Sequence, residues 1–262
     1  MSEDIKIKEE ITVYKGYRML YDLHTHTTFS HGKGSIQDNV EAAIRRGLVK
    51  IAITDHGPGH LTYGIKRSAV PEMRLQIEAL KKIYPQIQIG LSVEANIIKS
   101  GRCLDIKPEE FELYDFVIGG YHYGVFNGNC IPNYLDRHLP HKKAGKLDSR
   151  SLSRLRRRNT EMTVRAIYEN NLKILTHPGD KGPFDILAIA KACEEQGTLM
   201  EISTWHKHLT VDEIKTAALT DVRFIISSDA HVPERIGDFQ GGLDRAIEAG
   251  IDLDRIVNIE RV

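Results

Sequence analysis

The chain has 262 residues, carries 36 Lys and Arg against 36 Asp and Glu, and is 41% hydrophobic, so it is a neutral chain of ordinary globular composition. This balance argues against a dedicated nucleic-acid-binding protein. The apolar runs fall far short of the roughly 18 residues of a membrane span. The N-terminus has neither the basic nor the apolar region of a secretory signal, and three separated cysteines suggest no disulfide framework. We therefore expect a cytoplasmic protein.

Short apolar segments alternate with amphipathic helical segments along the chain, a pattern typical of βα units that build a parallel sheet. Residues 1–18 form a lead-in whose role the pattern does not indicate. The predicted strands cover residues 19–26, 50–56, 87–94, 115–122, 172–177, 198–204 and 222–229. The predicted helices cover residues 35–47, 71–83, 160–170, 185–195, 211–219 and 241–249. We expect one α/β domain at residues 19–262.

Histidines and acidic residues recur at the C-terminal ends of these strands, where parallel barrels carry their active sites. His24 and His26 lie two residues apart on the first strand and therefore point to the same side. Asp229 and His231 repeat this spacing at the last strand. Other strand ends and one loop contribute the remaining candidates, which are His31, His56, Glu94, His122 and His177. Six strands carry such residues, which favours one shared site over a chance distribution.

The nine candidates offer nitrogen and oxygen ligands without sulfur, which favours zinc, manganese or iron over copper(I) or an iron–sulfur cluster. A single ion with about four to six ligands cannot use all of them. The set therefore predicts two or three divalent transition-metal ions. Any one of these residues could instead be an ordinary hydrogen-bonded polar side chain, but that alternative does not explain the whole set.

The motifs resemble those of the PHP (polymerase and histidinol phosphatase) superfamily, and in particular its small single-domain bacterial phosphatases. The matching segments are Asp22 to His26, Ile53 to Pro58, Glu94 to Asn96, Thr176 to Gly179 and Ser228 to His231, with further likeness at Asn159-Thr160 and Asp254 to Asn258. The resemblance covers residues 20–258. It implies a distorted (β/α)7 TIM-like barrel, which agrees with the number of predicted strands.

The resemblance also implies three metal ions, with Glu94 bridging two of them. Two such ions can share a water and lower its pKa, which produces a metal-bound hydroxide in line with a phosphate ester. Asp22 and Asp55 are expected to orient the ligating imidazoles rather than to bind metal. The implied ligand sets are His24, His26, Glu94 and Asp229 for the first ion, Glu94, His122 and His177 for the second, and His31, His56 and His231 for the third.

The loops around the expected site offer candidates for substrate binding. Residues 123–158 form a basic insertion directly after His122, with nine Lys and Arg against two Asp, a net charge of +7. We expect this insertion over the metal face, where it would attract an anionic substrate, and a solvated basic loop is the alternative. The further candidates for substrate binding are Arg102, Trp205, Lys207 and Arg235. Three other histidines, His60, His138 and His141, are expected at the surface. His206 is not expected to hold metal.

These features predict a metal-dependent phosphoesterase and favour a phosphomonoesterase that acts on a small phosphorylated metabolite. The alternatives are a histidinol-phosphate phosphatase, an amidohydrolase-type hydrolase, and a metal-binding module without turnover. An amidohydrolase shares the first histidine pair, but it uses eight strands and has no histidine two residues after its last metal-binding aspartate, unlike Asp229 and His231 here. The sequence does not indicate which ester is cut, or the oligomeric state.

Overall fold

All predicted strand regions contain strands in the computed structural model, which describes residues 7, 10–138 and 148–262. The region predicted as one strand at 87–94 is divided because the chain changes partners there: Gln88–Leu91 pairs with the strand Lys50–Ile53, whereas Glu94 begins a second strand that pairs with Val117–Gly120. The strands are β2 (Tyr21–Asp22), β3 (Lys50–Ile53), β4 (Gln88–Leu91), β5 (Glu94–Asn96), β6 (Val117–Gly120), β7 (Leu172–Thr176), β8 (Leu199–Ser203) and β9 (Phe224–Ser227). A separate antiparallel pair joins β1 (Tyr17–Met19) to β10 (Ile259–Arg261).

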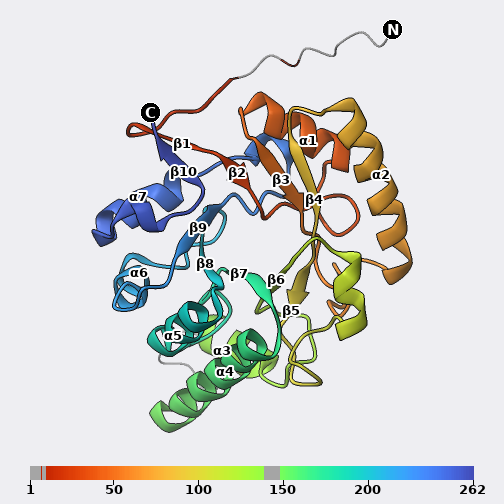
Figure 1. The fold of residues 1–262 in the computed structure, drawn as a ribbon. Coiled ribbons are helices and arrows are strands. Elements are labelled where there is room, and N and C mark those ends of the chain that lie inside the picture. The colour runs from red at the N-terminus through yellow and green to blue at the C-terminus, as the bar shows by residue number, and fades with distance from the viewer. Residues whose placement is uncertain (1–6, 8–9, 139–147) are drawn as a thin grey trace, which may run out of the picture.

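The main strands run parallel in two sheets, with the orders β2-β3-β4 and β5-β6-β7-β8-β9. Isolated parallel bridges connect Thr25 with Ala230 and His56 with Glu94, between the extensions of these strands. Figure 1 shows the strands arranged around a common centre with helices on the outside. A single α/β domain with parallel strands is therefore confirmed. The ladders among the described residues do not form one closed sheet, so barrel closure stays a prediction.

The helices agree with the predicted segments except around the basic insertion. Here helix α4 (Ser149–Glu169) begins at Ser149 rather than near residue 160, and the Asp148 side chain caps it by accepting a hydrogen bond from the Ser151 amide at 2.7 Å. The arginine-rich first half of α4 lacks a regular apolar stripe, so hydrophobic periodicity did not predict it. Helix α3 (Cys130–His138) was not predicted either. No helix in the described ranges is long and apolar enough to cross a membrane. The helices are α1 (Ile36–Arg45), α2 (Val70–Ile83), α3 (Cys130–His138), α4 (Ser149–Glu169), α5 (Ile186–Gln196), α6 (Val211–Ala217) and α7 (Gln240–Ala249).

A small apolar cluster in the strands underlies the polar strand ends. Six strand regions each supply one buried member, and these members are Leu23, Ala52, Ile118, Ile174, Leu199 and Ile225. A larger core packs the helices against the strands. On each of the six regions, histidines or acidic residues follow the apolar member within a few positions. Close packing at these members fixes the backbone from which the polar side chains extend.

Candidate metal centre

The structure brings all nine predicted ligands together at the C-terminal ends of the strands. Each group contains ligand atoms that lie within 4.8 Å of one another, and the groups share members, so they form one continuous cluster. A tenth residue, His206, joins the cluster although it was not predicted to hold metal. The groups are His26, His31, His56 and His231; His24, His26 and Asp229; His56, Glu94 and His122; and His177, His206 and Asp229.

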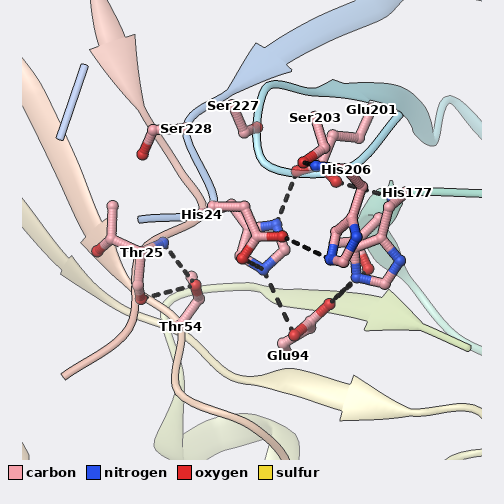
Figure 2. A network of polar contacts seen from close by, with 12 residues as sticks. His24, Thr25, Thr54, Glu94, His177, Glu201, Ser203, His206, Ser227 and Ser228 are labelled. Atoms are coloured by element: carbon pink, nitrogen blue, oxygen red, sulfur yellow. Dashed lines mark hydrogen bonds and ion pairs between the residues drawn. The ribbon is translucent and has the colours of Figure 1, made fainter. Parts of the chain in front are cut away.

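His24 lies in the buried part of this cluster, between two carboxylates (Figure 2). Its Nδ1 lies 2.7 Å from Oε1 of Glu201, and its Nε2 lies 3.4 Å from Oε2 of Glu94. The other oxygen of Glu201 accepts a hydrogen bond from the His177 amide at 2.7 Å. Glu201 was not predicted, because the strand at residues 198–204 is the one predicted strand without a candidate metal ligand. A fully buried glutamate in an otherwise apolar strand was the signal that could have identified it.

Glu94 faces different histidines with its two oxygens. Its Oε1 lies 2.9 Å from Nε2 of His177 and 3.1 Å from Nε2 of His122. Its Oε2 lies 2.8 Å from Nδ1 of His56 and accepts no hydrogen bond among the described residues. A carboxylate placed in this way can serve two cations at once.

The cluster shifts the pKa of its imidazoles in both directions and lowers that of Glu94. Burial lowers the pKa of His31 and of His122 to about 3, and in His31 the neighbouring His231 adds to the effect. Burial alone would raise the pKa of Glu94, but the imidazoles of His122, His24 and His56 hold it well below its ordinary value. Because imidazoles bind metal only when neutral and carboxylates only when ionised, His31, His122 and Glu94 are in their metal-binding form near pH 7. Despite burial, the carboxylates of Asp229, Glu201 and Glu94 raise the pKa of His24 well above its ordinary value, and Glu94 raises that of His177, so these two imidazoles release protons when metal binds.

Several buried polar atoms in the cluster have no hydrogen-bond partner among the described residues, including Asp229 Oδ2 and Glu94 Oε2. In addition, Nε2 of His24 lies 3.1 Å from Nε2 of His26, and the same atoms of His122 and His177 lie 3.3 Å apart. A buried acceptor without a donor costs about 1–3 kcal/mol. Divalent transition metals satisfy such a set of lone pairs, so these residues fit the predicted metals.

Asp22 and Asp55 are buried close to the cluster but do not contact the imidazole rings, contrary to the prediction. Asp55 accepts hydrogen bonds from the amide and the hydroxyl of Thr27, at 2.7 and 2.6 Å. Asp22 accepts from backbone amides, including that of Gly237 at 3.0 Å, and burial raises its pKa to about 6. Both residues therefore fix the backbone that carries the ligands.

A cavity of 280 Å³ opens onto the metal cluster. Trp205 lines it, as predicted, while Lys181, Tyr63 and Tyr123 were not predicted. His60 also lines it, which corrects its assignment to the surface. The complete lining is His31, His56, His60, Tyr63, His122, Tyr123, His177, Lys181, Trp205, His206, Asp229 and His231.

The other predicted substrate residues do not line this cavity. Arg102 and Lys207 are exposed, and the backbone carbonyl of Arg102 accepts a hydrogen bond from Asn170. The guanidinium carbon of Arg235 lies 4.7 Å from the ring centroid of Trp205, and the side chain pairs with Asp238 at 3.1 Å. Arg235 therefore contacts the Trp205 ring rather than the cavity. His138 is exposed, as expected, and His141 lies outside the described residues.

The basic insertion also differs from the expectation. Arg157 pairs with Glu161 on the same helix at 2.9 Å, and Arg156 donates to the carbonyl of Phe184. Tyr123, the first residue of the insertion, lines the metal cavity, and among the described cations of the insertion Arg137 has its guanidinium 3.7 Å from Asp180, the neighbour of Lys181 in the lining. The arginines of α4 are therefore not among the residues that line the metal cavity. Lys142, Lys143 and Lys146 lie outside the described residues.

A parallel α/β domain with a buried cluster of imidazoles and carboxylates at its strand ends defines a metal-dependent hydrolase. A sequence profile of the PHP domain matches residues 22–209, and the chain belongs to the PHP domain family. The superfamily predicted from the sequence is thus confirmed. The predicted enzyme class, a metal-dependent phosphoesterase, agrees with this membership.

Two curated relatives match over nearly the whole chain. The probable phosphatase YcdX of Escherichia fergusonii is 29% identical over 254 residues, which cover 91% of this chain and 89% of that protein. A probable phosphatase of Tolumonas auensis is 28% identical over 258 residues, with 92% and 90% covered. Among solved structures, histidinol phosphate phosphatase from Lactococcus lactis, in complex with zinc, L-histidinol and phosphate, has a TM-score of 0.58 at 18% identity, with 88% of this chain and 93% of that chain covered. This last likeness concerns the fold.

Proposed function

We propose that the chain is a metal-dependent phosphomonoesterase that acts on a small phosphorylated metabolite. The observation that carries the proposal is the position of Glu94, whose two oxygens face separate groups of histidines. A cavity of 280 Å³ next to this carboxylate suits a small ester better than a polymer. The names of the curated relatives support the phosphatase assignment. We also propose that the strands form the distorted seven-stranded barrel, closed through the bridge between Thr25 and Ala230.

The proposed metal ligands are those implied by the family resemblance, with Glu94 shared by two ions. When bound, divalent ions at such a centre activate water and neutralise charge on the phosphoryl oxygens. The remaining side chains have separate tasks. Glu201 orients His24, and Asp55 holds the turn at Thr27, which leads to His31.

Lys181 is the one Lys or Arg among the residues that line the described metal cavity, and we assign it to the substrate's phosphate group. Asp180 forms an ion pair with it and also lies 3.1 Å from Nδ1 of His206. Despite burial, His206, His177 and Lys181 lower the pKa of Asp180, so the carboxylate stays ionised. The aromatic side chains of Tyr63 and Trp205, which are partly exposed, supply the contact surface for the organic part of the ester.

The test is hydrolysis of a generic aryl phosphate and of a panel of phosphorylated metabolites, histidinol phosphate included, by the purified protein supplied with zinc or manganese. We expect two to three bound equivalents of metal, phosphate release, and loss of activity after treatment with a chelator. A protein that binds metal but releases no phosphate from any ester would be a metal-binding module. Less than one equivalent of metal after supplementation would reject the centre itself.

A further inference from the structure

A second cavity, of 370 Å³, lies between helix α4 and the loops that follow β5 and β6. This outer cavity shares no lining residue with the metal cavity. Its volume falls within the roughly 300–1,000 Å³ of small-molecule sites. The lining residues are Lys99, Cys103, Asn127, Gly128, Asn129, Arg158, Glu161, Met162 and Arg165.

Positive charge dominates the lining of the outer cavity. Its three cations are Lys99, Arg158 and Arg165, and its one acid, Glu161, already pairs with Arg157 at 2.9 Å. Across the described residues, Lys99 and Arg158 form no ion pair. The third cation, Arg165, pairs with Glu169 on the same helix. Lys99 and Arg158, which have no such counter-charge, create a local positive potential in an otherwise neutral chain.

The turn at residues 127–129 forms another part of the wall of the outer cavity and offers one backbone donor. Asn127 and Asn129 are buried there, with exposed fractions of 1% and 7%. Gly128 lies between them in the left-handed region at a φ of 77°, and its amide has no hydrogen-bond acceptor in the part of the chain that is described. A backbone amide without an acceptor, with Lys99 beside the turn and Arg158 on α4, can bind phosphate oxygens.

We propose that the outer cavity binds a phosphate-bearing anion at a site separate from the metal centre. Lys99 and Arg158 supply its counter-charges, and the turn at Gly128 supplies a donor. The same turn connects the site to the metal centre, because the side-chain Nδ2 of Asn127 donates to the backbone carbonyl of His122 at 3.3 Å. The inference rests on this cavity alone and does not depend on the proposed phosphatase activity.

Nuclear magnetic resonance titration of the zinc-loaded protein tests the proposal, with inorganic phosphate as one probe and a non-hydrolysable sugar phosphonate as the other. The amide resonances of Asn127, Gly128 and Asn129 report on the outer cavity, while those of His177 report separately on binding at the metals. Arg158→Gln removes a proposed counter-charge. Arg154→Gln is the matched control, since Arg154 lies one turn earlier on α4 and does not line the cavity.

We expect the titration to shift the three reporter resonances, with binding at least about tenfold weaker in Arg158→Gln and unchanged in Arg154→Gln. Lys99→Gln should weaken binding in the same way and serves if Arg158→Gln does not fold. If the two probes bind with equal affinity, the site is assigned to inorganic phosphate. If the phosphonate binds more tightly, the site is assigned to a phosphorylated metabolite. The proposal is overturned if neither probe shifts the reporters, or if Arg158→Gln and Lys99→Gln both bind like the parent.

Discussion

Glu201 and His24 form a fully buried pair in which Nδ1 of His24 donates to Oε1 of Glu201 at 2.7 Å. A proton on Nδ1 leaves the lone pair of Nε2 free, and that atom faces Glu94 and Asp229. Because the second oxygen of Glu201 accepts from the His177 amide, one carboxylate positions parts of two proposed ligands. This is how residues behind a metal centre orient its histidines.

Glu201→Gln should weaken zinc binding about 10- to 100-fold without unfolding the protein. The amide replaces one acceptor oxygen by a donor, so it no longer holds both the His24 ring and the His177 amide. The measurement is the zinc retained during titration with a competing chelator, together with the thermal unfolding midpoint. Glu194→Gln, at an exposed position on α5, is the control. Zinc retention equal to that of the parent in Glu201→Gln would show that the pair does not support the metals.

The nine proposed ligands could be found from the sequence because their position depends only on where parallel strands end. His24 and His26 converge with Asp229 once the strands are parallel, whatever the loops do. His206 and Lys181 could not be found in this way. They lie in loops after the strand ends, and loop conformation depends on contacts that periodicity does not reveal.

The roles of Asp22 and Asp55 were also beyond sequence reasoning. Side-chain parity tells which face of a strand a residue occupies, but it does not tell whether a carboxylate meets an imidazole or a backbone amide. The start of α4 was missed for a different reason. An Asp148 cap and a run of arginines form a good helix without a clear apolar stripe, since only the later part of α4 is deeply packed.

Glu94→Gln should reduce metal occupancy and turnover together, with kcat lowered at least about 100-fold. The substitution keeps the shape of the side chain but removes the charge that serves two groups of histidines. Both quantities are measured on the same preparation, metal occupancy by elemental analysis and turnover by hydrolysis of an aryl phosphate. Glu195→Gln, which alters an exposed glutamate on α5, should leave both quantities unchanged. Full turnover by Glu94→Gln would reject the shared position of this carboxylate.

Lys181→Met should raise KM for a phosphorylated substrate about tenfold or more while the bound metal stays constant. The reason is that Lys181 is the cation in the lining of the metal cavity but contacts none of the proposed ligands directly. Lys181→Arg, which keeps the charge, should recover most of the affinity. Lys207→Met is the matched control because Lys207 is exposed and outside the lining. An equal KM in Lys181→Met and the parent would remove Lys181 from the substrate site.

The N-terminus of α6 offers a pH-dependent contribution to stability that is independent of the metals. Glu213 accepts hydrogen bonds from the Thr210 amide at 2.7 Å and from Nδ1 of His208 at 2.8 Å. Burial alone would raise the pKa of Glu213, but these contacts lower it below the ordinary value of 4.5. The folded protein therefore favours the ionised form more than the unfolded chain does.

A carboxylate with a lowered pKa stabilises the fold above the unfolded-state pKa and loses this contribution as the pH falls through the folded-state value. Glu213→Gln should thus cost about 1–2 kcal/mol at pH 7, and the difference from the parent should shrink as the pH falls below 4.5. Urea unfolding of both proteins between neutral and acidic pH measures this difference in the free energy of unfolding. Protonation of the metal ligands affects both proteins alike and cancels in the difference. Glu248→Gln, at an exposed position on α7, is the control and should show no such pH dependence of stability. If the stability lost in Glu213→Gln is the same at every pH, the charge of Glu213 contributes nothing.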